Sequence, residues 1–506
     1  MEHLHTVLNN LLMGFGVALT PANVLYGIVG VIFGTFVGAM PGIGAPSGIA
    51  MLLPLTFGMN PTSGIIMLAG IYYGSQYGGS ITSILVNVPG EASSIVTCLD
   101  GHQMALKGRA GAAMAVAAVG SFVAGTFGTI MIMLVAMPIA NFALRFGPAE
   151  EFTIFLLAFT CLISFASESR SKTLVSIMLG LVIATVGIDP FLGRSRMTFG
   201  STDLMGGIDF ITVAIGIFGL GEVLIGFEEN IKMQFTKVPR LREVFPTVAE
   251  WKASCWPLIR GSVLGFCVGS VPGGGATVAS FLSYSLEKQV SRHPEKFGTG
   301  AIEGVAGPES ANNSATAGAM IPLLSLGIPG SGSAAVMMGA FMMWGLRPGP
   351  LLFEKDPQFV WALIASMYIG NVLLLFLNVA FIPTFVRILR LPFPVMKSFV
   401  VIFCLVGSYS FGTNLFDVWT MLGFGILGYL MKKLEFPQAP LVFAVILGPL
   451  IEVSFRQALT MSRGSLQIFV ASPVSACLVM AACLVLAVPP AWPLVRRVWR
   501  KDDSGQ

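Results

Sequence analysis

The stretch GGSITSILVNVPGEASS, from Gly78 to Ser94, places a polar, proline-broken segment between two long apolar flanks. Hydrocarbon disfavours its hydroxyls, its asparagine and its carboxylate. A Pro-Gly pair inside a span also removes one backbone donor and releases carbonyls from the helix ladder. Such breaks persist in a membrane only where protein or a water-filled cavity satisfies the freed groups. The stretch therefore predicts a broken helix whose polar break faces something other than lipid.

The composition of the whole chain is that of a membrane protein. Of its 506 residues, 55% are hydrophobic and only 11% are charged, and the mean hydropathy is +0.81. Soluble proteins carry about a quarter charged residues. Apolar runs near the ~20 residues that cross ~30 Å of hydrocarbon recur along the chain, and they are continuous where a β-barrel would alternate. We expect an all-α polytopic membrane protein with about 12–15 membrane segments, some of them re-entrant hairpins.

Charge and cysteine usage exclude several other classes. The net charge is +4, and no basic tract suits nucleic acid. The seven cysteines show no CxxC or metal-ligand spacing, so we expect small hydrophobic packing residues. The prediction is no cofactor and no resident metal, with Na⁺ left open as a transported ion.

The two halves of the chain resemble each other. GTFVGAMPGIGA, beginning at Gly34, aligns without gaps on GFCVGSVPGGGA, beginning at Gly265. Further along, NVPGEASS at Asn87 parallels GIPGSGSA at Gly327. Two such landmarks in the same order indicate an internal duplication, in which each copy carries a polar Pro-Gly break. The predicted helix breaks are Pro41, Pro89, Pro272 and Pro329.

The distribution of basic residues predicts the orientation of these copies. If the basic tail is cytoplasmic, most loop lysines and arginines fall on the same side. An odd number of crossings then separates the two copies, so they are inverted repeats. The expected organisation is an N-terminal amphipathic or interfacial segment (1–21), a first membrane repeat (22–227), a basic cytoplasmic linker (228–257), a second membrane repeat (258–490) and a cytoplasmic basic tail (491–506).

Inverted repeats with broken helices are a recurrent plan of secondary transporters, which bind substrate near the membrane midplane. Half-helix N-termini present free N–H groups to an anion, and hydroxyl and amide side chains can complete a carboxylate site. The predicted substrate-binding residues are Ser80, Thr82, Asn87, Gly90, Ser93, Ser94, Asn312, Asn313, Ser314, Gly330, Ser331 and Ser333. Ser47, Thr277, Tyr72, Tyr73 and Gln76 are secondary candidates. Two alternatives remain open: the breaks are surface turns, or the asparagines at 312 and 313 cap a helix.

Three residues are candidates for coupling transport to a cation: Glu91, Glu309 and Thr316. A carboxylate at membrane depth is a proton or cation carrier by default. The alternative for both acids is an aqueous position at a hairpin tip.

Long strings of the chain resemble the large membrane subunit of the tripartite tricarboxylate transporters, the TctA family. They are GAMPGIGAPSGIAMLLPLTFGMNP, YYGSQYGGSITSILVNVPGEASSIVTCLDGHQMALKGRAG, GPESANNSATAGAMIPLLSLGIPGSGSAAVMMGAF and GLRPGPLLF. The resemblance implies a multi-pass protein of the bacterial inner membrane that works with a small membrane subunit and a periplasmic solute-binding protein. It also implies import of citrate-like tricarboxylates or other small carboxylates, driven by an ion gradient and not by ATP.

The predicted function is therefore a carboxylate symporter, driven by Na⁺ or H⁺ with alternating access, and not an enzyme. Two other functions are alternatives. A passive anion channel would not accumulate its substrate. A membrane-embedded transferase would need clustered acid-base or metal groups, but the four histidines show no ligand spacing.

Overall fold

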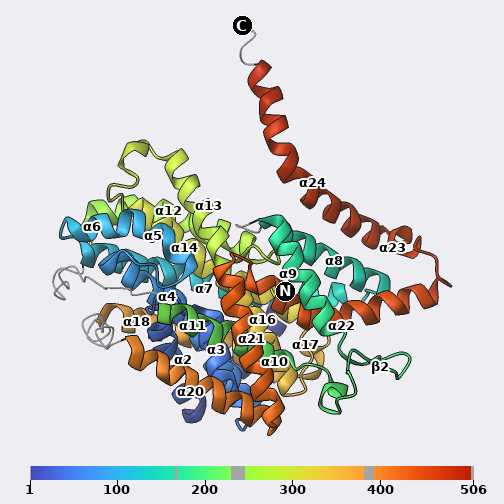
Figure 1. Cartoon of the computed structure of the whole chain (residues 1–506). Helices are drawn as coiled ribbons and strands as arrows, with labels where there is room; N and C mark the ends of the chain where they lie inside the picture. Colours follow the sequence, from blue (N-terminus) through green and yellow to red (C-terminus); the bar gives the residue numbers. More distant parts are fainter. Residues whose placement is uncertain (1, 166–168, 229–244, 381–392, 503–506) are drawn as a thin grey trace. The chain divides into compact units, whose positions relative to one another are not determined.

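The computed structural model describes residues 2–165, 169–228, 245–380 and 393–502, which are almost entirely helical (Figure 1). The predicted linker 228–257 falls partly outside these residues, and so does the end of the predicted tail. The described strands are β1 (Gly187–Ile188) and β2 (Ser195–Arg196), which pair antiparallel. The chain forms two compact units: unit 1 comprises Met1–Leu144 and Ile208–Leu434, and unit 2 comprises Arg145–Gly207 and Glu435–Gln506.

Unit 1 holds most of the helices. Its N-terminal half contains α1 (Glu2–Ala18), α2 (Pro21–Gly38), α3 (Ala45–Leu52), η1 (Leu53–Thr56), α4 (Pro61–Val86), η2 (Ala92–Ser94), α5 (Ile95–Thr97), η3 (Cys98–His102), α6 (Gln103–Leu106) and α7 (Ala110–Ala143). Its later part contains α10 (Phe210–Ala214), η5 (Ile215–Leu220), α11 (Gly221–Glu228), α12 (Val248–Gly269), α13 (Gly275–Val290), η7 (Pro294–Lys296), α14 (Glu303–Gly318), α15 (Met320–Leu326), α16 (Gly332–Met343), α17 (Leu352–Lys355), α18 (Pro357–Ala380), α20 (Phe393–Gly412) and α21 (Leu415–Lys433).

Seven of the described helices are long and apolar enough to cross a membrane. They are Pro21–Gly38, Ala110–Ala143, Pro148–Phe165, Phe210–Glu228, Pro357–Val379, Leu415–Lys433 and Gln438–Met461. Four shorter apolar helices of 10–17 residues accompany them, including Ala45–Thr56 and Gly332–Met343 beside the predicted breaks. The chain is thus a multi-pass helical membrane protein, as its composition predicted, and the number of 12–15 segments remains a prediction.

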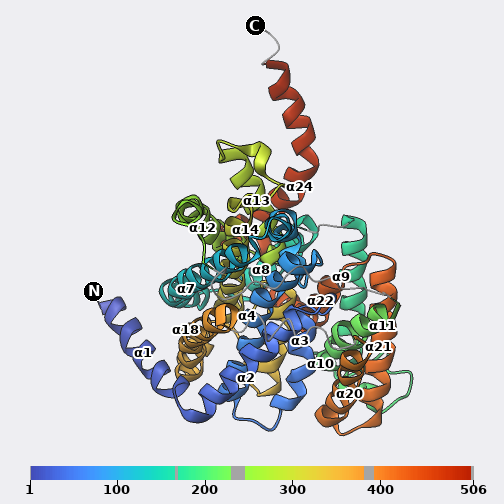
Figure 2. The ribbon, with the colours of Figure 1, turned by 90° about the vertical axis from the view of Figure 1, so that its left-hand side faces the viewer.

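Close glycine contacts join α2 to α4, which lie side by side in unit 1 (Figure 2). Gly30, Gly34 and Gly38 recur every fourth residue on one face of α2. A Cβ at these glycines would lie 2.2, 2.5 and 2.0 Å from the backbone oxygens of the residues opposite, at 67, 71 and 75 of α4. The opposite face of α2 exposes Leu25, at 59%. Small residues therefore let the two backbones touch, while the apolar face is left for lipid.

Close glycine contacts also join α12 to α14 in the second half of the chain. Gly261, Gly265 and Gly269 have the same spacing, and a Cβ at each would lie 2.2–2.3 Å from a backbone oxygen of α14. Gly34 and Gly265 are the residues that the sequence comparison aligned. The two aligned segments thus make equivalent contacts, each against a long helix that carries buried polar residues.

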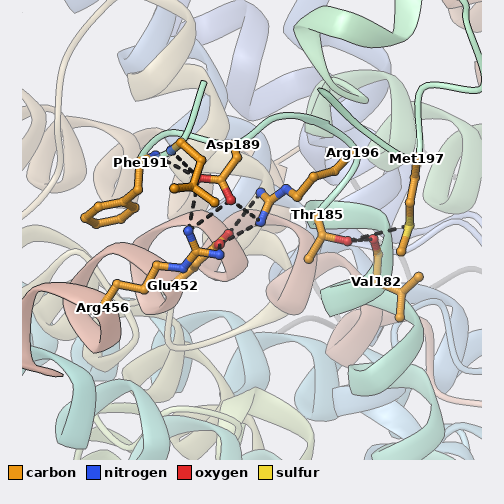
Figure 3. A network of polar contacts seen from close by, with 9 residues as sticks. Val182, Thr185, Asp189, Phe191, Arg196, Met197, Glu452 and Arg456 are labelled. Carbon is orange, nitrogen blue, oxygen red and sulfur yellow. Dashed lines mark hydrogen bonds and ion pairs between the residues drawn. The ribbon is translucent and has the colours of Figure 1, made fainter. Parts of the chain in front are cut away.

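Unit 2 is built from α8 (Pro148–Phe165), α9 (Arg170–Ala184), η4 (Asp203–Gly206), α22 (Gln438–Met461), α23 (Ile468–Ala471) and α24 (Pro473–Asp502), together with the two strands. A cluster of four charged side chains ties the loop after α9 to α22 (Figure 3). Arg456 donates to Asp189 at 2.9 Å, and Arg196 donates to Glu452 at 2.7 Å. Phe191 and Leu192 donate their backbone N–H groups to the same aspartate, at 2.8 and 2.9 Å.

Candidate functional site

The polar stretch that opened the sequence analysis is helical up to Val86, because α4 continues through it. Ser80 and Thr82 therefore lie in the last turns of α4 and not in the break. The break begins at Asn87, whose φ of 59° is left-handed, a conformation that asparagine tolerates better than most residues. Asn87 is exposed, so its observed role is to end the helix.

The first hairpin tip, Pro89–Ser94, is packed inside the protein. A Cβ at Gly90 would lie 2.0 Å from the carbonyl oxygen of Gly38, so only glycine fits there. Ser93 is 2% exposed and donates to Gln76 Oε1 at 2.8 Å. Ser94 is fully buried and donates to the carbonyl of Glu91 at 2.8 Å. This burial is incompatible with a surface turn.

The carboxylate of Glu91 lies at the N-terminus of α3. It accepts a hydrogen bond from the backbone N–H of Ala45, the first residue of that helix. Anions are favoured at this position, because the N–H groups of a first helical turn lack intrahelical partners. The break at Pro41 thus creates the N-terminus of α3, to which Glu91 of the first tip binds.

The second hairpin tip, Gly327–Ser333, has the same shape. Helix α15 ends at Gly327 with φ of 68°, and α16 begins after a break that contains Pro329. Gly273, next to the break at Pro272, donates its N–H to the carbonyl of Gly330 at 3.2 Å. Ser331 caps α16 by accepting from the N–H of Ala334, at 3.2 Å.

The second tip meets α4 of the first half. The hydroxyls of Ser331 and Tyr72 lie 2.6 Å apart. Gln76, one turn further along α4, accepts from Ser93 of the first tip at 2.8 Å. Tyr72 and Gln76, both secondary candidates from the sequence, therefore place contacts to the two tips on neighbouring turns of α4. Ser333 of the second tip is buried, at 5% exposure.

A second group of polar residues surrounds Glu309, which is fully buried in α14. Its carboxylate accepts from Ser80 Oγ at 2.6 Å, from Thr97 Oγ1 and from Asn312 Nδ2 at 3.2 Å. Asn313 donates to Ser121 Oγ at 2.7 Å. Thr97 and Ser121 were not predicted, because their helices carry no local polar motif that would single them out.

The asparagines lie in the middle of α14, which begins at Glu303. The helix-capping alternative for Asn312 and Asn313 is therefore wrong. Ser314 points away from this group and donates to the carbonyl of Ser262 in α12, at 2.6 Å. The Thr82 hydroxyl donates within its own helix, to the carbonyl of Gly79 at 3.4 Å.

Asp100, in the helix after the first tip, connects the two halves. Its Oδ1 accepts backbone N–H groups from Gly298, Gly300 and Ala301 at 2.7–2.9 Å, and Tyr284 donates to Oδ2 at 2.9 Å. The sequence analysis did not select this residue. Its partners hold the segment that leads into α14, and thereby Glu309, against the first hairpin.

Two buried, broken-helix tips inside a multi-pass helical protein define an architecture that recurs among secondary transporters. Residues 24–443 match the tripartite tricarboxylate transporter TctA family, and the chain belongs to this family. Membership identifies it as a subunit of a tripartite transporter, a system that implies a small membrane subunit and a periplasmic binding protein.

The chain is also similar to two proteins of Agrobacterium vitis. An uncharacterized 52.8 kDa protein in the TAR-I ttuC' 3' region is 46% identical over 487 residues, which cover 96% of this chain and 97% of the relative. An uncharacterized protein in the TAR-II ttuC' 3' region is 45% identical over 242 residues, 47% of this chain and 100% of the relative. No solved structure matches the chain.

Proposed function

We propose that this protein is the large transmembrane subunit of a secondary transporter that imports citrate-like tricarboxylates or other small carboxylates. Family membership supports transport as the activity. The observation that carries the proposal is that both tips contact α4 about one turn apart. Ser93 of the first tip donates to Gln76 at 2.8 Å, and the hydroxyls of Ser331 of the second tip and Tyr72 lie 2.6 Å apart. A gradient of Na⁺ or H⁺ drives uptake. The substrate site at the tips opens alternately to the two sides of the membrane.

The substrate site in this proposal consists of neutral donors. Neither tip sequence, NVPGEASS or GIPGSGSA, contains a lysine or arginine. A carboxylate is held by hydroxyls and by the N–H groups at the starts of the tip helices, such as α16. Such a site binds without a fixed cation, so release toward the cytoplasm requires no ion pair to break.

We propose in addition that residues 22–227 and 258–490 are inverted repeats, placed in the bacterial inner membrane with residues 228–257 and 491–506 in the cytoplasm. The equivalent glycine contacts of α2 with α4 and of α12 with α14 support a common origin. Labelling of single cysteines placed at His102 and Lys296 tests the sidedness. Both should react only from the cytoplasm, and reaction from opposite sides would contradict the inversion.

The function is tested by uptake into cells that carry the small membrane subunit, with and without the cognate binding protein, across a panel of mono-, di- and tricarboxylates. We expect accumulation against a gradient that needs the binding protein and collapses with an ionophore. Equilibration without accumulation would instead identify a passive anion channel.

A further inference from the structure

Glu309 is a buried carboxylate without a cationic partner. It is fully buried, and no lysine, arginine or histidine of the described chain forms an ion pair with it. Two other buried acids of the described chain are neutralised by arginines: Glu287 pairs with Arg260 at 2.5 Å, and Asp189 with Arg456 at 2.9 Å. Asp100 and Glu91 are held by backbone N–H groups instead. A buried charge without a counter-ion costs several kcal/mol.

The donors around Glu309 favour its charged form over its protonated form. Ser80, Thr97 and Asn312 all donate to the carboxylate. The amide nitrogen of Asn312 can only donate, so a proton on the oxygen that it contacts would lose this bond. Hydrogen bonds to the charged form stabilise a carboxylate, but they do not neutralise it. A cation beside the carboxylate would supply the positive charge that these neutral donors lack.

Asn313 supplies an oxygen that lacks a partner. Its Oδ1 is buried and accepts no hydrogen bond, while its Nδ2 faces three acceptors: Ser121 Oγ at 2.7 Å, the Glu309 carbonyl at 3.0 Å and Asn312 Oδ1 at 2.6 Å. Exchanging the two amide atoms would set oxygen against these oxygens, so this orientation is the favoured one. A buried polar atom without a partner is a place where a water or an ion is expected.

The surrounding geometry suits a small monovalent ion. Glu309, Asn312, Asn313 and Thr316 occupy positions i, i+3, i+4 and i+7 of α14, which lie on one face of a helix. A cavity is lined by Ser80 and Ser121, the hydroxyls that hydrogen-bond to Glu309 and Asn313, together with Tyr77 and Asn378. Hard cations take hydroxyl, amide and carboxylate oxygens. Only one carboxylate contacts the group, so a single positive charge balances it.

We propose that Glu309, the Asn313 carbonyl oxygen and the hydroxyls of Ser80 and Thr97 bind a sodium ion inside the membrane. The inference rests on the proposed function, in which a cation gradient drives uptake. It assigns the coupling ion to the group around Glu309 and not to Glu91, whose carboxylate is held by the N-terminus of α3. Ser80 belongs to α4 and Glu309 to α14. The site therefore forms only where the two halves of the chain contact each other.

The test measures sodium binding without transport. The purified full chain in detergent is heated at constant pH and constant ionic strength in NaCl, KCl or choline chloride. We expect a saturable rise in melting temperature with Na⁺ alone. Glu309→Gln should abolish the rise, and Asn313→Ala should raise the half-saturating Na⁺ concentration about tenfold or more. The control Glu354→Gln changes an exposed acid of α17 and should behave as wild type.

Three results would overturn the proposal: no Na⁺-specific rise in the wild type, an unchanged rise in Glu309→Gln, or an unchanged half-saturating concentration in Asn313→Ala. If Glu309→Gln fails to fold, Ser80→Ala and Asn313→Ala carry the test. Carboxylate accumulation driven by a proton gradient, with no Na⁺ effect on melting, would contradict this site and leave the importer intact. A Na⁺-specific rise in melting temperature, in a protein that accumulates no carboxylate, would support this site and contradict the proposed import function.

Discussion

The Tyr72 hydroxyl is the single atom on which the proposed substrate site depends most. It lies 2.6 Å from Ser331 Oγ, so it connects α4 to the second tip. A hydrogen bond between neutral groups contributes about 1 kcal/mol. It fixes the position of the tip more than it stabilises the fold.

Removing either partner of this contact should therefore lower uptake more than stability. We expect Tyr72→Phe and Ser331→Ala each to reduce the uptake rate roughly fivefold to tenfold, with no further loss in the double variant. Initial rates in cells, normalised to membrane expression, provide the measurement. Ser254→Ala removes a buried hydroxyl of α12 that donates to the Glu250 carbonyl, and should leave uptake unchanged. Fully additive losses would argue against a shared contact.

The carboxylate of Glu91 caps the N-terminus of α3 by accepting the N–H of Ala45. Substitution by alanine leaves the buried N–H of Ala45 without an acceptor, which costs about 1–3 kcal/mol. Glu91→Gln keeps a carbonyl oxygen at the same place and should retain more than half of this stability. Thermal unfolding of both variants measures the difference. Equal melting temperatures for Glu91→Ala and wild type would show that the cap contributes nothing.

At the scale of elements, α4 and α14 decide how the polar residues are arranged. Both are buried over nearly their whole length, and each packs against a glycine-bearing helix. A buried helix can carry hydroxyls and amides only if other helices satisfy them. Ser80 of α4 donates to Glu309 of α14 at 2.6 Å. Other elements satisfy further polar residues of the two helices: Tyr77 donates to Asn371 of α18, and Asn313 to Ser121 of α7.

The glycine contacts set the distance between α2 and α4, and between α12 and α14. Gly34→Val places a Cβ 2.5 Å from the Ile71 backbone oxygen, so α2 and α4 must separate. We expect a loss of about 3 kcal/mol, measured as a fall in the melting temperature of the purified protein. Gly16→Val is the matched control, because a Cβ at Gly16 in α1 meets no atom within 4 Å. A fall of equal size in both variants would assign the effect to helix propensity.

At the scale of the molecule, the chain builds two units with different polar interiors. Unit 1 surrounds the buried carboxylate of Glu309 with neutral donors. The described charged cluster of unit 2 instead pairs two acids with two arginines where the loop after α9 meets α22, as Figure 3 shows. Paired charges favour a fixed structure, whereas unpaired ones suit the passage of an ion.

The cluster of unit 2 predicts a pH dependence. The backbone N–H groups of Leu192 and Phe191, with the Arg456 guanidinium, lower the pKa of Asp189 to about 2. The carboxylate is therefore more acidic in the folded state than in the unfolded state, where the value is about 3.9. Its contribution to stability is present above about pH 4 and is lost as the pH falls toward 2.

The variant Asp189→Asn should accordingly melt below wild type at pH 6, and the difference should shrink below pH 4. Melting curves of the purified protein between pH 6 and 2.5 measure this. The control Glu435→Gln breaks an exposed pair with Lys172 and should change little at any pH. A difference that is independent of pH would refute the assignment to ionised Asp189.

The sequence by itself determined the class of protein and the four helix breaks, at Pro41, Pro89, Pro272 and Pro329. Hydrocarbon forces every backbone group to find a local partner, so apolar runs and Pro-Gly pairs mark helices and their breaks without reference to the rest of the chain. The tertiary structure alone decided which polar groups meet. Thr97 and Ser80 reach Glu309 across 212 and 229 residues, and Ser314, adjacent to Asn313, turns to α12 instead. The rotation of one helix against another sets these contacts, and it follows from the close packing of both halves, which no local pattern encodes.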